Sequence, residues 1–291
     1  MVEREPETIL LCRPLRLEIR HTLAMLWNPN APTLIGVVHL PATPGAPGFS
    51  GSFGAVVEEA VRDARALATG GCDGIIVENF GDAPFFQGEV PPETIAGLAL
   101  AVQAVREVAE GAAVGVNVLR NDVRAALGIA AVTDSSFVRV NVHTGAMVTD
   151  QGLIQGEAAA TVRERERLCP AVQIFADVHV KHAAPLAPSS IEESAVETLG
   201  RGRADAVILS GVATGAPVDC AELARVRERA AGARILIGSG LTAENADSLL
   251  AFADGAIVGT YLKRDGVLAN PVDAERVKRL RECFDRLSPI R

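Results

Sequence analysis

Short apolar runs alternate with amphipathic stretches along most of this chain. Eight runs rich in Val, Ile and Ala are each followed by a segment in which apolar residues recur with helical spacing. The runs are apolar almost throughout, which predicts strands buried on both faces, as in a parallel sheet. The predicted strands are 33–40, 73–80, 112–119, 136–143, 172–180, 205–211, 234–240 and 255–260, and the clearest helical patterns are 55–71, 92–111, 220–232 and 271–287.

Eight strand–helix units in succession predict one α/β domain, a (β/α)8 TIM barrel over residues 33–291. A doubly wound sheet would need a GxGxxG turn after its first strand, whereas here that strand runs into "HLPATPGAPGFSG" (39–51). Residues 1–32 are expected to be an N-terminal extension that packs on the barrel, either closing its bottom or forming an oligomer contact. We expect a homo-oligomer.

Long segments follow three of the predicted strands, whereas the segments that precede the strands are short. They are residues 41–54, 81–92 and 144–158. In a TIM barrel the segments after the strands lie on the carboxyl-terminal face, where active sites are built. The first and third of these segments are expected to act as lids that set specificity.

Composition narrows the class of protein further. The chain of 291 residues is 48% hydrophobic but only 4% aromatic, which suits an aliphatic barrel core. Its net charge of −8 lacks the excess of positive charge that is typical of nucleic-acid-binding proteins. The five cysteines form no CxxC pair, which argues against a zinc cluster and for a cytoplasmic protein with reduced thiols. Residues 21–57 lack charged side chains, but five prolines and five glycines exclude a membrane span there.

The last two predicted strands both end in small residues. Gly238-Ser239-Gly240 and Gly259-Thr260 follow them, at the place where TIM barrels commonly bind a phosphate through backbone N–H groups. Glycine permits a close approach of the main chain, and the two hydroxyls can donate hydrogen bonds. Glycines can also simply form tight turns, but two such turns on adjacent strands favour a phosphate site. Lys263 could add a charge, and Thr242 reads as a helix cap.

Ionisable residues cluster at other strand ends. Side chains alternate along a strand, so Asp177, His179 and Lys181 are expected to share one face. Glu78 and Asp177 are the predicted acid/base pair, and Lys181 is predicted to stabilise negative charge. Replacing Asp177 with Asn is expected to abolish turnover and leave thermal stability nearly unchanged. A Schiff base at Lys181 is disfavoured, because the nearby Asp177 would keep that lysine charged.

Residue usage supports a site in this region. The chain has only three lysines, and four of its five histidines fall at predicted strand ends. The predicted catalytic residues are Glu78, Asp177, Lys181 and His179, and the predicted substrate-binding residues are His39, Asn79, Asn117, Asn121, Asp122, Arg139, Asn141, His143, Ser210 and Thr214. No cofactor is firmly predicted. A divalent metal held by His39, Glu78, Asp177 and His179 is the alternative, because they form a mixed His/carboxylate set.

Several long motifs resemble the BtpA (BtpA/SgcQ) family from about residue 33 to about residue 285. They are "VVHLPATPG", "IIVENFGDAPF", "VGVNVLRNDVRAAL", "FVRVNVHTGAMVTDQGLIQG", "ADVHVKHA", "ILSGVATGAPV" and "IGSGLTAEN…ADGAIVGTYLKRDG". The resemblance implies a barrel of the ribulose-phosphate-binding group. The family's polar motifs fall on Glu78, Asn79, Asn117, Arg120, Asn121, Asp122, Arg139, Asn141, Asp177, Lys181, His182 and Thr214-Gly215. "VVHLPATPG" stands where members often show Pro-Leu-Pro-Gly.

Two classes of function remain open. The first is an enzyme that acts on a phosphorylated sugar or nucleotide-like molecule by acid/base catalysis, as an isomerase, epimerase or lyase or by cleaving a glycosidic bond. The second is a non-enzymatic assembly factor with a metabolite-sensing phosphate site, because the family's name comes from photosystem I biogenesis. A scaffold has little need for several ionisable groups in a barrel mouth, where desolvation is costly, which favours the enzyme.

Overall fold

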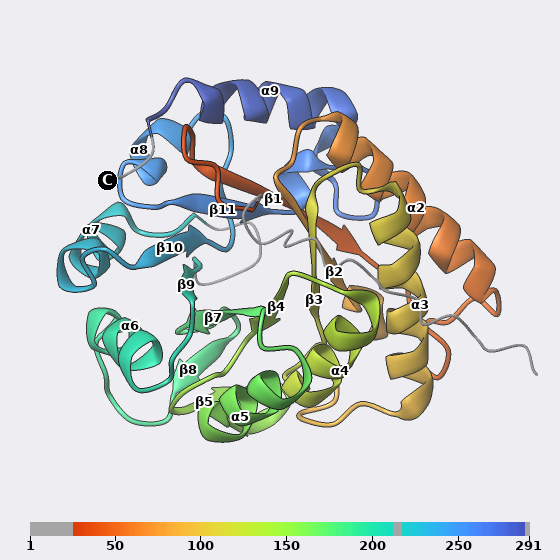
Figure 1. Cartoon of the computed structure of the whole chain (residues 1–291), viewed down its shortest axis with the longest axis horizontal. Helices are drawn as coiled ribbons and strands as arrows, with labels where there is room; N and C mark the ends of the chain where they lie inside the picture. Colours follow the sequence, from red (N-terminus) through yellow and green to blue (C-terminus); the bar gives the residue numbers. More distant parts are fainter. Residues whose placement is uncertain (1–25, 212–216, 289–291) are drawn as a thin grey trace, which may run out of the picture.

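The chain folds into a closed barrel of eight parallel strands, as predicted. The computed structural model describes residues 26–211 and 217–288. The strand order is β1-β11-β10-β9-β7-β4-β3-β2, and helices surround the strands (Figure 1). The barrel strands are β1 (Thr33–His39), β2 (Gly74–Glu78), β3 (Ala113–Asn117), β4 (Phe137–Val140), β7 (Gln173–Val178), β9 (Ala206–Leu209), β10 (Arg234–Ile237) and β11 (Gly255–Val258).

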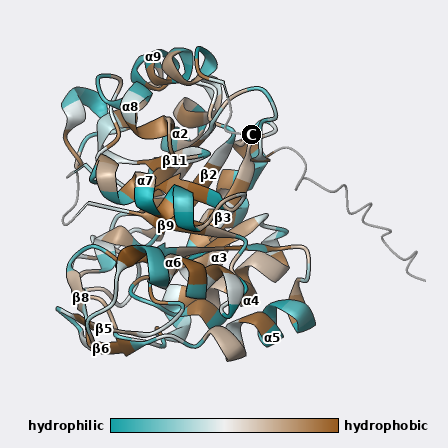
Figure 2. Cartoon of the chain, turned by 90° about the vertical axis from the view of Figure 1, so that its left-hand side faces the viewer, coloured by the Kyte–Doolittle hydropathy of each residue, from teal (hydrophilic) through white to brown (hydrophobic). Residues whose placement is uncertain are grey.

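Each barrel strand lies within one of the eight predicted runs, and a helix or helical turn follows each. All four clear helical patterns are helices. The helices are α2 (Phe53–Thr69), α3 (Pro92–Val108), α4 (Val123–Thr133), α5 (Ala158–Leu168), α6 (Ile191–Gly200), α7 (Cys220–Arg229), α8 (Ala246–Leu250) and α9 (Ala274–Asp285). Side chains that point outward from the strands form one continuous apolar layer with these helices, and the central strands are the most hydrophobic part of Figure 2.

A separate apolar cluster fills the lower barrel interior. It includes Phe137 and Phe175, which are fully buried and stack with ring centroids 4.9 Å apart. Gly115 has no side chain at this level, and the Phe137 ring occupies the space that a Cβ there would need. The barrel is therefore a packed core at this end and not a pore.

The described end of the N-terminal extension closes the bottom of the barrel. Leu26 is fully buried in the interior cluster, and Trp27 packs on Phe175 while its indole N–H donates to Gln173 Oε1 at 3.0 Å. Arg234 lies over the Trp27 ring at 4.8 Å. Among residues 1–32, the structure describes 26–32; the rest of the predicted extension lies outside the described residues, and its packing stays a prediction.

Strand register places polar residues above this core. His39 on β1 pairs with Glu78 on β2, and Glu78 pairs with Asn117 on β3. Two residues earlier on the same strands, Val37 lies beside Ile76. Because alternate residues share a face, the interior changes from apolar to polar within one step of the pleat.

A second, three-stranded sheet was not predicted. The segment after β4 forms an antiparallel hairpin of β5 (Ala146–Thr149) and β6 (Gly152–Gln155), and β5 also pairs with β8 (Ala183–Pro185) from the segment after β7. The predicted lid over 144–158 is therefore ordered strand structure, hydrogen-bonded to the segment that follows Lys181.

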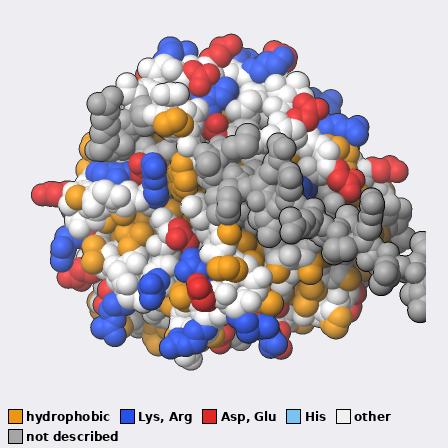
Figure 3. All heavy atoms as spheres, in the orientation of Figure 1, with side chains coloured by type: hydrophobic (Ala, Val, Ile, Leu, Met, Phe, Trp, Pro, Cys, Tyr) orange, Lys and Arg blue, Asp and Glu red, His pale blue; other side chains and the backbone are white. Residues whose placement is uncertain are grey.

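The molecular surface carries mixed charge. Acidic and basic side chains are interspersed with apolar ones over the face drawn in Figure 3. Among the described helices, none has both the length and the apolar character that a membrane crossing requires.

Phe137→Ala is expected to lower the free energy of unfolding by about 3–5 kcal/mol, because it removes a fully buried ring and leaves a cavity. Val132→Ala, at a side chain that is 75% exposed, is the control and is expected to change the stability by less than about 0.5 kcal/mol. Chemical denaturation of both variants measures the difference. Equal effects would show that the interior cluster does not stabilise the barrel.

Candidate functional site

The two glycine turns lie on one cavity at the carboxyl-terminal end of the barrel. Gly238-Ser239-Gly240 and Gly259-Thr260 line a space of about 230 Å³. Five ionisable side chains line the same space, namely His39, Glu78, Arg139, Lys181 and Tyr261. Residues from six barrel strands or the segments after them thus meet at one place, as expected from the fold.

Glycine is needed in these turns for two different reasons. Gly240 has φ +70°, a conformation that glycine adopts without strain. Gly238 and Gly259 have no positive φ, but a Cβ at Gly238 would collide with the Ser210 hydroxyl and one at Gly259 would lie 2.6 Å from His39 Cε1. Two of the three glycines therefore let the backbone lie against neighbouring side chains, which a simple turn does not require.

Hydrogen bonds fix the first turn. Asn245, which precedes α8, accepts from the Thr242 N–H at 2.8 Å and donates to the Gly240 carbonyl at 2.9 Å. Ser239 Oγ accepts from the Gly211 N–H at 3.1 Å. Thr242 is therefore part of the loop that Asn245 organises, rather than the cap of the helix.

Lys263 does not supply a charge to the turns. It is 3% exposed, and its ammonium donates to Asp63 Oδ2 on α2 at 2.6 Å. Asp63 also accepts from the Val272 N–H at 3.1 Å. The sequence showed a lysine beside the turn but not this carboxylate, which lies 200 residues earlier in the chain.

Arg139 organises the buried charges of the site. Its Nε and Nη2 donate to the two oxygens of Asp177, both at 2.9 Å, and its Nη1 donates to Glu78 Oε1 at 3.1 Å. The side chains are 4%, 0% and 7% exposed for Arg139, Asp177 and Glu78, respectively. This bidentate geometry is the strongest arrangement open to an arginine and a carboxylate.

These contacts keep both partners of the Arg139–Glu78 pair charged. Burial alone would raise the pKa of Glu78, but Arg139, His39 and a hydrogen bond from Asn117 outweigh it and lower the pKa. Burial alone would lower the pKa of Arg139, but Asp177 and Glu78 raise it. Glu78 is therefore a carboxylate at neutral pH, able to accept a proton.

Two predicted substrate ligands hold the carboxylates in place. Asn117 donates to Glu78 Oε1 at 3.1 Å, and Asn141 donates to Asp177 Oδ2 at 2.9 Å. Together with Arg139, Asn141 occupies both oxygens of Asp177, whose side chain is fully buried and does not line the cavity. The structure therefore places Asp177 behind Arg139, whose side chain it holds in position, and leaves Glu78 as the carboxylate that lines the cavity.

His39 faces the cavity as a neutral imidazole. Burial lowers its pKa to about 4, with Glu78 acting in the opposite direction and Lys263 and Lys181 adding to the effect. Its Nδ1 is buried and has no hydrogen-bond partner among the described residues. The ring packs edge-on against Phe80, with centroids 4.9 Å apart.

Lys181 reaches the same cavity from the segment after β7. Arg120 donates to its backbone carbonyl at 2.7 Å. Burial, and then the charge of Arg139, lower the pKa of the Lys181 ammonium. Arg120, Arg139 and Lys181 are three cations around the two carboxylates Glu78 and Asp177, so this region has an excess positive charge within an acidic chain. Arg120 lies three residues after the end of β3, and the resemblance to the family had already marked this position.

His179 does not join Asp177 and Lys181 on one face. Strand β7 ends at Val178, and His179 has φ +50°, which breaks the alternation of side chains. Its Nε2 contacts the hydroxyls of Ser189 at 3.2 Å and Ser194 at 3.1 Å, near the start of α6. The prediction of a shared face was wrong for this residue, because a strand pattern does not reveal where the strand ends.

Four further predicted ligands make hydrogen bonds to neighbouring segments. Asn79 accepts from the Leu119 N–H at 2.7 Å, and Asn121 bonds the N–H and carbonyl of Val142. Asp122 accepts from the Ala125 N–H at 2.9 Å as the N-cap of α4, and His143 Nε2 lies 2.8 Å from the Gly202 carbonyl. These side chains brace the segments after β2, β3 and β4.

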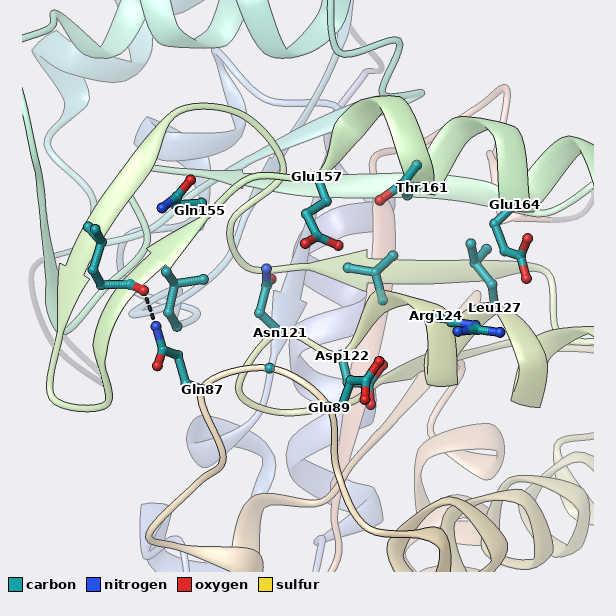
Figure 4. A pocket seen from close by; sticks show the side chains of 15 residues that line it. Gln87, Glu89, Asn121, Asp122, Arg124, Leu127, Gln155, Glu157, Thr161 and Glu164 are labelled. Atoms are coloured by element: carbon teal, nitrogen blue, oxygen red, sulfur yellow. Dashed lines mark hydrogen bonds between the residues drawn. The ribbon is translucent and has the colours of Figure 1, made fainter.

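Asn121 and Asp122 line a separate, larger groove of about 830 Å³ outside the barrel (Figure 4). Gln87 donates to the Leu153 carbonyl across it, which joins the segment after β2 to the hairpin. Of the remaining predicted ligands, Ser210 has a buried hydroxyl with no partner among the described residues, beside Gly238. Thr214 lies outside the described residues.

The residues predicted as metal ligands do not converge on one site. Asp177 is fully engaged by Arg139 and Asn141, and His179 lies near Ser189 and Ser194. Within residues 26–211 and 217–288, no three His, Cys, Asp or Glu side chains converge as metal ligands. The four residues named for that alternative are therefore not brought together.

A sequence profile described as the BtpA family matches residues 30–286. The chain belongs to the BtpA family. It is 45% identical to the photosystem I biogenesis protein BtpA of Synechocystis sp. over 86% of this chain and 87% of that protein. It is equally similar, at 45% identity, to an uncharacterized protein of Thermococcus kodakarensis over 87% and 95% of the two chains.

Solved structures confirm the fold of this BtpA-family chain. The thiamine phosphate pyrophosphorylase of Pyrococcus furiosus superposes with a TM-score of 0.55 over 87% of this chain and 96% of that one, at 15% identity. The phosphoribosyl anthranilate isomerase of Thermus thermophilus superposes with a TM-score of 0.52 over 87% of this chain and 98% of that one, at 14% identity. At these identities the likeness establishes the barrel alone.

Asp177→Asn is expected to lower the free energy of unfolding by about 3 kcal/mol or more, because it leaves the buried Arg139 without its bidentate partner. This revises the expectation of nearly unchanged stability. Asp134→Asn, which removes an exposed ion pair to Arg106, is the control and is expected to cost less than about 1 kcal/mol. Urea denaturation at pH 7 compares the two, and similar values would contradict the positioning role.

The neutral state of His39 predicts a pH-dependent contribution to stability. Its pKa is about 4 in the folded chain and 6.5 when unperturbed, so the unfolded chain takes up the proton first as the pH falls. The difference in unfolding free energy between the wild type and His39→Gln should rise from pH 4 to 6.5, by up to about 3 kcal/mol. Titrating groups that do not interact with His39 cancel in this difference, and Glu78, whose pKa is lowered below its usual value, stays ionised over most of this range. A difference that does not vary with pH would contradict the neutral assignment.

Proposed function

We propose that this BtpA-family barrel is an enzyme that acts on a phosphorylated sugar or nucleotide-like small molecule by acid/base chemistry. One observation carries the proposal: both glycine turns share a cavity with a carboxylate base, a neutral imidazole and two cations. The reaction class is isomerisation, epimerisation or lyase cleavage, or cleavage of a glycosidic bond.

The phosphate would bind at the turns. The backbone of Gly238–Gly240 and Gly259-Thr260 can approach an anion closely, and the Ser239 and Thr260 hydroxyls add polar groups. The excess positive charge from Arg120, Arg139 and Lys181 favours an anionic ligand although the chain as a whole carries a net charge of −8. The Ser210 hydroxyl, which has no hydrogen-bond partner within the described part of the chain, offers one further group beside this site.

The proton chemistry would be carried out by the groups that face the cavity. Glu78, held ionised by Arg139, would accept a proton from the substrate, and the neutral His39 could donate or relay one. Arg139 and Lys181 would stabilise the negative charge that develops when a proton is removed beside a carbonyl group. Asp177 would act through Arg139, whose orientation it fixes.

A non-enzymatic assembly factor is the second candidate. It is favoured by the 45% identity to a protein named for photosystem I biogenesis. Such a factor would bind a phosphorylated metabolite without altering it. The two candidates therefore differ in one measurable outcome, chemical change of a bound ligand.

Ribose 5-phosphate is expected to raise the melting temperature of the chain, whereas unphosphorylated ribose is not, because the turns bind the phosphate. Thr260→Val removes one hydroxyl at nearly constant volume and is expected to weaken binding about tenfold, the effect of one hydrogen bond to a charged group. Thermal shift and titration calorimetry measure the two effects.

Gly128→Ala is the matched control, because a Cβ at Gly128 in α4 meets no atom within 4 Å. It is expected to bind the ligand as the wild type does. Equal responses to ribose and ribose 5-phosphate would contradict the phosphate site. Mass spectrometry of a panel of phosphorylated sugars and nucleotides then separates the candidates: a ligand that stabilises the chain and is never altered favours the assembly factor.

A further inference from the structure

We infer that Lys181 is a nucleophilic amine that captures the carbonyl group of a phosphorylated aldehyde or ketone as an imine. The inference deepens the proposed function, because it rests on the phosphate binding at the turns beside this lysine. It names a substrate class, the carbonyl form of a phosphorylated sugar, and a covalent step for the same cavity.

The surroundings of Lys181 reverse the argument that a carboxylate keeps it charged. Asp177 is engaged through both oxygens by Arg139 and Asn141, and Glu78 accepts from Arg139 and Asn117. The Lys181 ammonium makes no hydrogen bond or ion pair to any of these groups or to other described residues. Burial and the charge of Arg139 lower the pKa of Lys181 and outweigh Glu78 and Asp177, which act in the opposite direction.

The other two lysines of the chain lie in different surroundings. Lys263 is buried and forms an ion pair with Asp63 at 2.6 Å, and Lys278 is exposed on α9 and pairs with Glu275 at 2.8 Å. Lys181 is half-buried, is not paired among the described residues and lines the cavity. A lysine becomes a nucleophile when it is desolvated or lies beside another cation, and both conditions hold here. The lowered pKa of Lys181 agrees with this geometry.

The step balances without any additional reactant. The Lys181 ammonium first releases a proton, and the neutral amine adds to the carbonyl carbon. The oxygen takes up one proton from the attacking nitrogen and the one released before, it leaves as water, and a protonated imine remains. Glu78 then accepts a proton from the neighbouring carbon, and the electron pair of that C–H bond moves into the imine to give an enamine. Reprotonation of the enamine followed by addition of water releases the product and restores the amine. No oxidant, reductant or metal is required.

Reductive trapping tests the inference directly. The full chain is incubated at pH 7 with glycolaldehyde phosphate and sodium cyanoborohydride, which reduces imines, and the modified lysine is identified by peptide mass spectrometry. Lys181 is expected to be modified about tenfold faster than Lys278 or more, because the bound phosphate holds the aldehyde beside the amine. Modification of Lys278 at an equal or greater rate would overturn the inference.

Two variants and one competing ion complete the test. Lys181→Met should abolish the fast modification, and Lys278→Met should leave it unchanged. Because the decisive adduct is located on the wild-type chain, the result does not depend on the variants folding. Inorganic phosphate should slow the modification of Lys181 by competing for the turns.

The outcomes separate this inference from the proposed phosphate site. Fast modification of Lys181 by both glycolaldehyde phosphate and unphosphorylated glycolaldehyde, with no competition by phosphate, supports the amine and contradicts the phosphate site. Stabilisation of the chain by ribose 5-phosphate with no preferential adduct at Lys181 supports the phosphate site and overturns the imine.

Discussion

The site depends on one buried arginine that binds two carboxylates. Among the described residues, Arg139 is the only cation that forms ion pairs with both Glu78 and Asp177, and its bidentate contact to Asp177 fixes its direction across the barrel. If Arg139 were turned away, two buried carboxylates would lose their ion-pair partner, and an unpaired buried charge is strongly destabilising. The orientation of the Arg139 side chain thus stabilises the ionised state of both carboxylates.

The same constraint explains how the roles divide. Asp177 and Glu78 look equivalent in sequence, yet Asn141 and Arg139 occupy both oxygens of the first, while the second keeps one face toward the cavity. Arg139 binds both carboxylates, so Lys181 has no ion-pair partner among the described residues, and burial together with Arg139 lowers its pKa against the effect of Glu78 and Asp177. A site with a paired arginine and an unpaired lysine uses the difference between the two residues: the guanidinium stays charged, and the ammonium can lose its proton.

The barrel and the meeting of the two glycine turns at one cavity could be predicted from the sequence because both depend on local patterns. Apolar runs mark strands such as β2, and Gly259-Thr260 directly follows one of them. The failures involve contacts distant in the chain or the ends of strands. Lys263 pairs with Asp63, which lies far away in the sequence. The strand alternation of side chains ends before His179, which has a positive φ. The pairing of β5 with β8 joins two segments whose sequences give no sign of pairing. Asn79 and Asp122 carried the right residue types for ligands, and only coordinates reveal that backbone groups use them.

The pairing of β5 with β8 has a consequence for how this family could diversify. In most TIM barrels each loop above the strands can lengthen or shorten alone. Here the ladder from Met147 to Thr149 against Ala183 to Pro185 ties two loops into one unit, and Leu186 continues it by bonding to Ala146. An insertion in either loop would shift the register of the other and move the backbone next to Lys181. The two loops are therefore expected to evolve together, so that altered selectivity comes from exchanging the whole three-stranded module.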